Sequence, residues 1–543
     1  MKSFFLLAFT FLYILSNAQS LTYEWANVLF GYDYDNIEGL YVENNGNIYI
    51  TGEFQSTIDF DPSAQNYELT SNVSNDIFIA KYTSSGDFIW AKQLSGTSNE
   101  ESVYISGDIS GNIYITGTYE GTLDFDPATG ISEHTSNGGE DLFLAKYDCN
   151  GNFLWANSFG NSALQRSSKL IIDDNDNVIF TGFFVGTIDF DPGSGIEELT
   201  SIDVGMGGSD IFLAKYDSNG DFIWVNSYAD ITNEQSFDLC LDNSGNIIMT
   251  GYWCDNLFTK QFFIYRIDSN GSPVDGFMIP CDIESVGYSI TTDVSNNFYV
   301  TGIYQGTIDF DLSTNVSELT SQGYKDVFIA KYNTNFSFVW AKSIGGTSTD
   351  EPVNINLSSD NTIQVAGNFK DIVDFDPGSG TDFFTSLGET DIFILNLDTA
   401  GNYISKNIIG DLSYDVIDRM YFNNGNMIIA GSFDGTVDFD PGSNIENLSS
   451  IGNDDIFIAK YNTPVGINFI SESNDLIIYP NPTTGKFTID ISVFDKIEIL
   501  NTLGQVVIET KKQNIDIRNL SDGIYLVKVS LGNETISEKI IKN

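Results

Sequence analysis

The sequence has few of the residues from which most catalytic and zinc sites are built. Its 543 residues include one histidine, His134, and four cysteines. A Ser/His/Asp or Cys/His triad would therefore depend on His134 alone. No Cys-x-x-Cys pair and no Cys/His spacing typical of zinc is present. These absences argue against a hydrolase with a histidine base and against a zinc domain.

Basic residues are also scarce. The chain holds 24 Lys and Arg against 75 Asp and Glu, a formal net charge of -51. Before residue 474 the arginines are Arg166, Arg266 and Arg419, which fall at different places in the pattern described below and do not predict an arginine cluster. A surface this acidic repels nucleic acid and anionic lipid and can collect cations. We therefore expect no nucleic-acid partner.

Long apolar stretches are missing after the first residues. Residues 1–18, MKSFFLLAFTFLYILSNA, combine an early lysine, an apolar run and a small-residue cleavage site at Ser16-Asn17-Ala18. This pattern is typical of a secretory signal peptide. No later stretch approaches the roughly 20 apolar residues of a membrane-spanning helix. We expect export and no transmembrane helix, with an uncleaved anchor as the alternative.

A repeated pattern fills most of the chain. A glycine in the pattern [IVFM]-[TA]-G returns at Gly52, Gly117, Gly182, Gly251, Gly302, Gly367 and Gly431. Seven units of this size indicate a solenoid, a propeller or an array. In the second unit, residues 102–106, 113–119, 142–147 and 153–159 form four extended runs, with D-x-x-G-N turns after the first and third. Four short strands per unit predict the blade of an all-β propeller with seven blades.

The ends of the repeat region indicate a closed ring. The fourth run carries tryptophan in several units, as in Phe153-Leu154-Trp155-Ala156, and the seventh unit lacks this run. A matching run, Tyr23-Glu24-Trp25-Ala26, is present at the N-terminus. We expect residues 23–30 to complete the seventh blade and remove an exposed sheet edge. The recurring tryptophans are interpreted as packing between blades.

Six units insert GTIDFDP, or a near copy, between their second and third strands, followed by a short second run. We expect a small hairpin with its two aspartates on one side, because strand side chains alternate. The paired aspartates are Asp59 and Asp61, Asp124 and Asp126, Asp189 and Asp191, Asp309 and Asp311, Asp374 and Asp376, and Asp438 and Asp440. Two carboxylates plus a loop carbonyl would suit calcium. Asp-Pro-Gly is also an ordinary turn opener, so both interpretations remain open.

Two more charged positions recur beside the third strand. An aspartate precedes it at Asp76, Asp141, Asp210, Asp326, Asp391 and Asp455, and a lysine lies within it at Lys81, Lys146, Lys215, Lys331 and Lys460. The lysines could neutralise aspartates of the same blade. The fourth unit departs from the pattern, because it lacks the hairpin and contains Cys240, Cys254 and Cys281. In an oxidising compartment we expect one disulfide among these three, with Cys149 unpaired.

The composition changes after a linker at residues 463–474. Residues 475–543 alternate strands and tight turns, which predicts a small Ig-like β-sandwich. Its notable residues are Tyr479, Pro480, Asn481, Pro482, Gly485, Gly523, Tyr525 and Lys542. This segment resembles the C-terminal sorting domain of type IX secretion substrates. The resemblance implies a bacterium with two membranes, the type IX machinery as partner, and delivery to the outer-membrane surface or the extracellular space.

Residues 21–462, with DIFIAKY, GNFLW and GNIYITG, resemble the bacterial seven-bladed propeller repeat family. Such propellers host unrelated functions, so the family does not indicate an activity. We predict a non-catalytic binding or adhesion module for a glycan or protein ligand, with calcium as a candidate cofactor and no oligomeric state implied. The alternatives are a secreted glycan-active hydrolase or lyase using carboxylates on the propeller face, and a structural surface protein.

Overall fold

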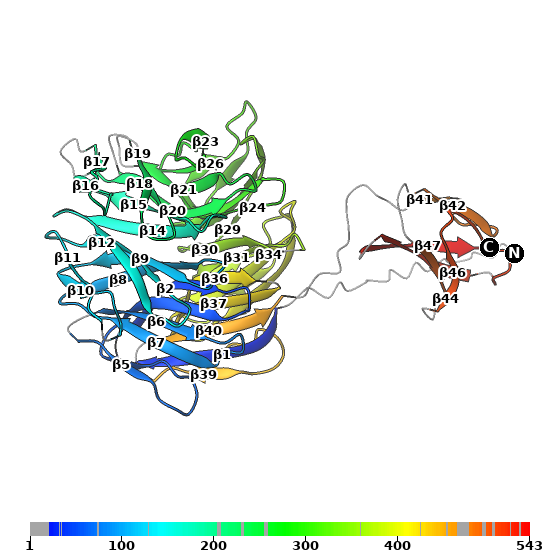
Figure 1. The fold of residues 1–543 in the computed structure, drawn as a ribbon. Coiled ribbons are helices and arrows are strands. Elements are labelled where there is room, and N and C mark those ends of the chain that lie inside the picture. Colours follow the sequence, from blue (N-terminus) through cyan, green and yellow to red (C-terminus); the bar gives the residue numbers. More distant parts are fainter. Residues whose placement is uncertain are drawn as a thin grey trace. The chain divides into compact units, whose positions relative to one another are not determined.

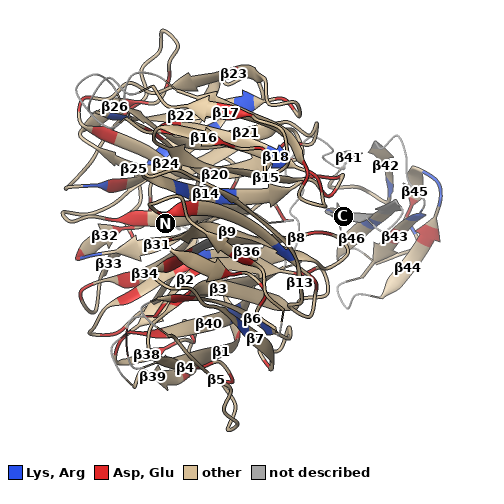
Figure 2. Cartoon of the chain, turned by 60° about the vertical axis from the view of Figure 1, so that its left-hand side comes forward, with Lys and Arg blue, Asp and Glu red and all other residues tan. Residues whose placement is uncertain are grey.

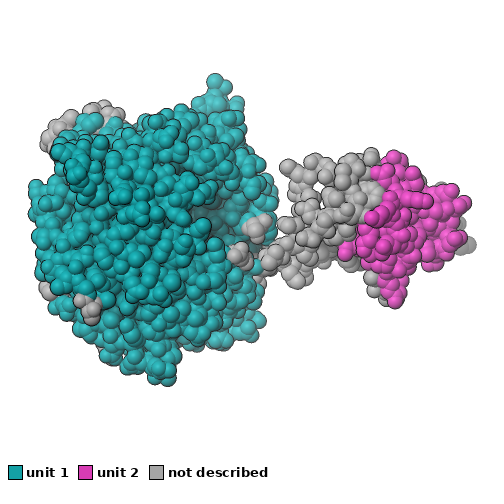
Figure 3. Space-filling view, viewed as in Figure 1, with its two compact units in different colours: residues 1–465 teal, residues 466–543 magenta. Residues whose placement is uncertain are grey.

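The computed structural model describes residues 21–543 except 32, 34, 73–74, 129, 203–207, 230–232, 255–258, 359, 424, 452–453, 464–476, 480, 491–495, 502–504, 522 and 532–533. The expected signal peptide and most of the expected linker lie outside these residues. The described residues form strands and no helix. They fall into two compact units, residues 1–465 and 466–543 (Figure 3).

The first unit is built from four-stranded antiparallel sheets, here called blades 1 to 7 in chain order (Figure 1). Blade 1 contains β2 (Asp35–Val42), β3 (Ile48–Phe54), β6 (Asp76–Tyr82) and β7 (Phe88–Leu94). Blade 2 contains β8 (Glu100–Gly107), β9 (Ile113–Tyr119), β12 (Asp141–Tyr147) and β13 (Phe153–Phe159). Blade 3 contains β14 (Gln165–Ile172), β15 (Val178–Phe184), β18 (Asp210–Tyr216) and β19 (Phe222–Tyr228).

The remaining blades follow the same order of strands. Blade 4 contains β20 (Glu234–Leu241), β21 (Ile247–Cys254), β22 (Lys260–Ile267) and β23 (Pro273–Met278). Blade 5 contains β24 (Glu284–Thr292), β25 (Phe298–Gln305), β28 (Asp326–Tyr332) and β29 (Phe338–Ile344). Blade 6 contains β30 (Glu351–Leu357), β31 (Ile363–Phe369), β34 (Asp391–Leu397) and β35 (Tyr403–Ile409). Blade 7 contains β36 (Asp415–Asn423), β37 (Asn426–Phe433), β40 (Asp455–Asn462) and β1 (Thr22–Gly31).

The first strands of the blades contact one another in chain order, and β36 of blade 7 contacts β2 of blade 1. The ring is therefore closed. Its last sheet is completed from the other end of the chain, because β1 pairs with β40 and places Trp25 opposite Lys460 and Val28 opposite Phe457. This confirms the predicted closure by the N-terminal strand. The hydrophobic core lies between blades, as where Ile77 of blade 1 packs in one cluster with Phe143 of blade 2.

Six hairpins project between second and third strands, at the GTIDFDP segments. They are β4–β5 (Thr57–Asp59, Glu68–Thr70), β10–β11 (Thr122–Asp124, Glu133–Thr135), β16–β17 (Thr187–Asp189, Glu198–Thr200), β26–β27 (Thr307–Asp309, Glu318–Thr320), β32–β33 (Ile372–Asp374, Phe383–Thr385) and β38–β39 (Thr436–Asp438, Asn447–Ser449). Residues just after a fourth strand pair with the hairpin of the next blade, as Gly96 does with Leu123. The hairpins and the blade-to-blade links therefore share one face.

In five blades the tryptophan of the fourth strand docks on a turn of the next blade. Trp155 of blade 2 donates its indole N–H to the carbonyl of Ser218 at 3.2 Å, and Lys146 Nζ donates to the same carbonyl at 2.9 Å. Gly220 of this turn has φ +85°, and a Cβ placed on it would lie 3.0 Å from the Trp155 ring. The same clamp joins Trp25 to Gly86, Trp90 to Gly151, Trp224 to Gly271 and Trp340 to Gly401. The predicted role of tryptophan between blades is confirmed.

In blades 2 and 3 the lysine of the clamp also has an acidic partner in its own blade. Lys146 Nζ lies 3.5 Å from Asp108, and Lys215 Nζ lies 2.7 Å from Asp173. These acids belong to the turn between first and second strands, not to the hairpin aspartates. The recurring lysines thus neutralise acids of their own blade, as expected, and at the same time bind the next blade.

Blade 4 replaces the clamp by a different pair of residues. Arg266 stands where the other blades have lysine, opposite Asp275. The receiving turn of blade 5 has Phe336 at φ +59° in place of glycine. The Arg266 guanidinium stacks 4.9 Å from the Phe336 ring and donates to the carbonyl of Thr334. Loss of the tryptophan and loss of the glycine therefore occur together, because a phenylalanine side chain would occupy the space of the indole.

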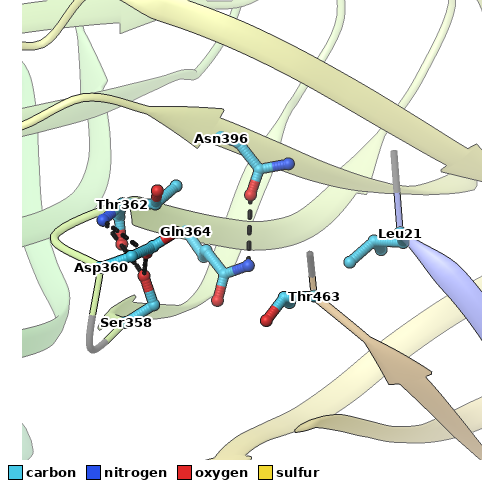
Figure 4. A pocket seen from close by; sticks show the side chains of 7 residues that line it. All are labelled: Leu21, Ser358, Asp360, Thr362, Gln364, Asn396 and Thr463. Atoms are coloured by element: carbon cyan, nitrogen blue, oxygen red, sulfur yellow. Dashed lines mark hydrogen bonds between the residues drawn. The ribbon is translucent and has the colours of Figure 1, made fainter. Parts of the chain in front are cut away.

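The junction between blades 6 and 7 has no clamp. In blade 7 the third and fourth strands come from opposite ends of the chain, so no turn connects them. Blade 6 carries Asn396 and Ser405 where other blades have lysine and tryptophan, and Gln364 Nε2 donates to Asn396 Oδ1 at 3.2 Å. Figure 4 shows this pair beside Leu21 and Thr463, the residues that flank β1 and β40. The departure of the sixth unit from the repeat follows from the position of the ring's seam.

Buried carboxyl groups meet at several blade junctions. The aspartate that begins a third strand lies beside the first residue of the next blade, as Asp76 does beside Glu100. Burial, and then the charge of Asp76, raises the pKa of Glu100 to about 8. Burial, followed by a facing aspartate, likewise raises the pKa of Asp35 and of Asp350 to about 7. These pairs therefore hold protons at neutral pH. Blade 3 has the uncharged Gln165 at this position.

The cysteines are thiols in the structure. The Cys281 thiol donates to the carbonyl of Lys260 at 3.0 Å, Cys254 is buried in a different cluster, and no disulfide joins the described cysteines. The expected disulfide in the fourth unit is therefore wrong. Cys240 and Cys281 pack against one hydrophobic cluster and Cys254 belongs to another, so crowding in the sequence did not bring the three side chains into bonding geometry.

The second unit consists of two small sheets. The first sheet contains β41 (Ile477–Tyr479), β42 (Lys486–Asp490) and β45 (Asn514–Asp516). The second contains β43 (Lys496–Leu500), β44 (Val506–Thr510), β46 (Gly523–Leu531) and β47 (Glu534–Lys542). Ile489 and Ile515 from the first sheet share one buried cluster with Ile499, Val527 and Ile540 from the second. Two sheets thus enclose one core.

The clamp predicts a difference between two Gly→Ala substitutions in similar turns. Gly220 and Gly245 both have positive φ, but a Cβ on Gly220 would press on Trp155 whereas a Cβ on Gly245 meets nothing within 4 Å. Both variants should lose about 1 kcal/mol through backbone strain. Gly220→Ala should lose a further ~1–3 kcal/mol by displacing the indole. Urea unfolding followed by circular dichroism measures this, and equal losses would contradict the clamp.

The carboxyl pairs predict that stability falls as pH rises. Their pKa values are higher in the folded than in the unfolded protein, so the folded state binds more protons between about pH 4 and pH 8, and its free energy of unfolding decreases across that range. Glu100→Gln, which copies the natural Gln165, should reduce this slope. The control is Glu133→Gln on the exposed side of β11. If the free energy of unfolding of Glu100→Gln changes with pH as steeply as that of the wild type, the Asp76–Glu100 pair does not hold the predicted proton.

Candidate functional site

The paired hairpin aspartates hold turns in this structure. Asp59 Oδ1 accepts the backbone N–H groups of Asp61 at 3.1 Å and Tyr67 at 2.8 Å. Asp61 Oδ1 in turn accepts the N–H of Ser63 at 2.9 Å. The first aspartate of the other five hairpins accepts the same two bonds: Asp124, Asp189, Asp309, Asp374 and Asp438. Each pair therefore fixes its own loop.

No group of three or more His, Cys, Asp or Glu side chains is placed to hold a metal ion among the residues that the structure describes. The recurring aspartates before the third strands lie apart from the hairpin pairs, at the blade junctions. Asp76 Oδ2, for example, accepts the N–H of Asn72 at 3.2 Å and the hydroxyl of Ser95 at 2.9 Å. The recurring acids thus have separate structural roles, because some fix the hairpin loops and others lie at the blade junctions. Figure 2 shows Asp and Glu at many places on the propeller.

A cavity of about 450 Å³ lies where the first strands of all seven blades converge. Each of these strands has an irregular register near its middle, and the residue after the irregularity lines the cavity or its edge. These residues, here called the channel ring, are Gly39, Tyr104, Lys169, Asp238, Ser289, Asn354 and Arg419. Bulges commonly re-aim side chains beside functional sites. The bulge here turns one residue per blade toward the axis.

The channel ring carries a different residue in every blade. The partner of each ring residue on the second strand is instead threonine in five blades and alanine in two: Thr51, Thr116, Thr181, Thr250, Thr301, Ala366 and Ala430. Several of these threonines bond a backbone carbonyl of the third strand, as Thr116 does with Phe143 at 2.8 Å. The strand behind the ring is therefore conserved across blades as framework, while the ring itself departs from the repeat.

One half of the ring is organised around Asp238. Its carboxylate accepts from Lys169 Nζ at 2.9 Å, from the backbone N–H of Leu239 at 3.0 Å, from Ser289 Oγ at 2.8 Å and from the N–H of Ile290 at 2.9 Å. Asn354 Nδ2 continues the chain of bonds to Ser289 Oγ at 3.3 Å. Four donors saturate this carboxylate. Asp238 therefore positions Lys169 and Ser289 and has little capacity left for a ligand.

The other half of the ring is organised around Arg419. Its Nε donates to the carbonyl of Glu38 at 2.6 Å, and one terminal nitrogen lies 3.0 Å from the Glu38 carboxylate. The guanidinium reaches across blade 1, where Gly39 contributes no side chain, and lies 5.0 Å from the Tyr104 ring of blade 2. Lys169 Nζ lies 5.7 Å from the same ring. Tyr104 therefore separates the two cations that line the cavity.

Two further acids border this half. Burial raises the pKa of Asp418 to about 7, although Arg419 opposes the shift. One Asp418 oxygen is buried and accepts no hydrogen bond within the described chain. Burial also raises the pKa of Glu38, again against the effect of Arg419. A buried carboxyl with a pKa near neutrality can exchange a proton at physiological pH.

Sequence reasoning missed the channel ring. It searched for catalytic and metal residues that recur, whereas the ring is defined by a position that does not. Counting back 13 residues from the recurring glycine reaches the ring residue in six units, as from Gly182 to Lys169. In the seventh unit the same count from Gly431 reaches Asp418, because that unit is one residue shorter between the two positions. The sequence alone therefore did not align Arg419 with Lys169, and the basic residues of the cavity were not recognised as a pair.

The residues noted in the C-terminal segment hold its turns. Asn481 Nδ2 donates to the carbonyl of Lys539 at 2.7 Å, and its Oδ1 accepts the N–H of Ile541 at 3.0 Å. Gly485 has φ +117°, and Tyr525 donates its hydroxyl to the carbonyl of Ser521 at 2.8 Å. Gly523 pairs with Lys542, Tyr479 lies in β41, Pro482 follows Asn481, and Pro480 lies outside the described residues.

Comparison with known families identifies this segment. Residues 477–543 match the secretion system C-terminal sorting domain. This domain directs export by the type IX secretion system to the cell surface or the extracellular space. The described residues contain no helix that is both long and apolar enough to span a bilayer.

The repeat region is similar to WD repeat proteins. An uncharacterised WD repeat-containing protein of Acanthamoeba polyphaga mimivirus is 27% identical over 261 residues, which cover 39% of this chain and 18% of that protein's length. The match therefore spans under one fifth of the relative.

Solved propeller structures are similar at low identity. Sqt1 of Chaetomium thermophilum is 9% identical, with a TM-score of 0.40 over 82% of this chain and 100% of that one. The Pan2 WD40 domain of Neurospora crassa is 9% identical, with a TM-score of 0.38 over 82% and 97%. Puromycin hydrolase is 10% identical, with a TM-score of 0.34 over 74% and 59%. The fold assignment rests on the sheet topology itself, and the chain is a β-propeller repeat protein with a type IX secretion sorting domain at its C-terminus.

Proposed function

We propose that this protein is an exported binding module whose ligand enters the central cavity and contacts the channel ring. The observation that carries the proposal is the ring position itself, which has seven different residues, whereas its partner on the second strand is threonine in five blades and alanine in two. A repeat maintained only for packing has no reason to vary at one position in every copy. Variation there, beside a cavity of about 450 Å³, is what recognition of an asymmetric ligand requires.

The composition of the ring supports binding rather than catalysis. Its polar groups bond one another, and Asp238 is saturated by four donors. A general acid or base needs an available lone pair or proton in reach of the substrate. The sorting domain supports a role outside the cell, where the ligand is a glycan or a protein of the cell surface or its surroundings.

A second candidate is cleavage of a glycan, as a hydrolase or lyase. Asp418 favours it, because this buried carboxyl has a pKa raised to about 7 and adjoins Arg419 in the ring. A carboxyl of this pKa suits proton transfer at neutral pH. The array screen described next also tests this candidate, because a glycan-cleaving enzyme would leave shortened glycan products.

The test is a screen of the full chain against glycan and matrix-protein arrays, first with calcium and then with chelator. We expect Tyr104→Ala to weaken capture of the ligand by about tenfold or more, as for aromatic residues at the centre of a binding site. The matched control is Ile196→Ser on a hairpin, where the side chain is 74% exposed. Capture abolished by the hairpin variant and unaffected by Tyr104→Ala would move the site to the hairpin face. Circular dichroism confirms that both variants fold.

A further inference from the structure

The channel ring has an excess of hydrogen-bond donors toward the cavity. Lys169 has three N–H groups and gives one to Asp238. Arg419 has five and gives three, to the carbonyl and carboxylate of Glu38 and to the carbonyl of Asp418. Asp238, the acidic residue in the lining of the cavity, already accepts four bonds. The two cations thus retain donors that the ring does not use.

These two residues are also the basic residues among those that line the cavity. They lie on either side of Tyr104, at 5.7 Å and 5.0 Å from its ring. A Cβ placed on Gly39 would lie 2.3 Å from Thr51 Oγ1 and 2.9 Å from Ile105 Cγ2, so a side chain does not fit at this ring position. The rest of the lining is mixed, with polar residues such as Ser106, Thr291 and Asn356 beside apolar ones. The site therefore combines cationic donors and an aromatic face in a cavity of mixed polarity.

From this arrangement we infer that the ligand group held in the cavity is a single carboxylate, carried by a small and otherwise uncharged unit of the glycan or protein ligand. The inference rests on the proposed function, because it names the ligand class of the same site. A carboxylate accepts from Arg and Lys together, and an amide or hydroxyl of the same shape gains less from them. A volume of about 450 Å³ holds one small molecule and not a folded domain.

The charge of the whole protein restricts the ligand further. The net charge of -51 repels a polymer with many negative groups before it reaches the cavity. A molecule with a single carboxylate meets far less repulsion. Within the cavity its charge is balanced by the two cations. An acidic polysaccharide is thus disfavoured, and a monocarboxylate is favoured.

The experiment compares acids with their uncharged counterparts. D-glucuronate, benzoate and N-acetylglycine are titrated into the full chain by calorimetry, each beside its primary amide. We expect at least one acid to bind saturably at millimolar concentration or below, and at least tenfold more tightly than its amide. Equal affinity of acid and amide, or no saturable binding by any acid, would overturn the inference.

Variants then locate the bound acid. Lys169→Met alone would leave Asp238 buried without its cation, so it is combined with Asp238→Asn to keep the site neutral and folded. The double variant should bind the acid at least tenfold more weakly, and Lys342→Met on β29 should bind it as the wild type does. Acid binding that survives the double variant at full strength would overturn the inference as well.

The outcomes separate this inference from the proposed function. If the array screen finds an uncharged ligand whose capture depends on Tyr104, the cavity is the binding site and only the carboxylate inference fails. If captured ligands depend on hairpin residues and on no channel-ring residue, the proposed site fails and the inference fails with it.

Discussion

The ring depends on a contact that each blade makes with the next. An indole from a fourth strand rests on a turn whose glycine has positive φ, and a lysine from the third strand binds a carbonyl of the same turn. The glycine serves both needs, since it accepts the backbone conformation and leaves room for the indole. Every blade thus receives its neighbour at its outer edge, while apolar side chains fill the space between the sheets.

The exceptions to this contact show that its glycine, tryptophan and lysine are lost together. Where Phe336 replaces the glycine, the indole is gone and Arg266 stacks on the phenylalanine instead. Where the chain enters and leaves the ring, no turn exists, and both lysine and tryptophan are replaced by Asn396 and Ser405. A departure from the repeat in one blade is therefore explained by the turn of the next blade that it contacts.

Much of this architecture could be predicted from the sequence because it depends on local patterns. Three local patterns predicted it: alternating apolar and polar residues for the strands, D-x-x-G-N for the turns, and the run around Trp25 for the closing strand. The channel ring could not be found in the same way. Lys169 and Arg419 are 250 positions apart by subtraction, and their proximity follows only once the ring is closed. The carboxyl pairs were missed for the same reason, because each joins residues of two blades.

The strand order of blade 7 has a mechanical consequence. The chain leaves the propeller from β40, which is hydrogen-bonded to β37 on one edge and to β1 on the other. A pull applied through the C-terminal segment would load an interior strand rather than peel an outer one. The hydrogen bonds of β40 to β37 and to β1 would have to break together before the ring opened. If the protein were held at a surface by its C-terminal segment, fluid drag would thus act on a strand that is hydrogen-bonded along both edges.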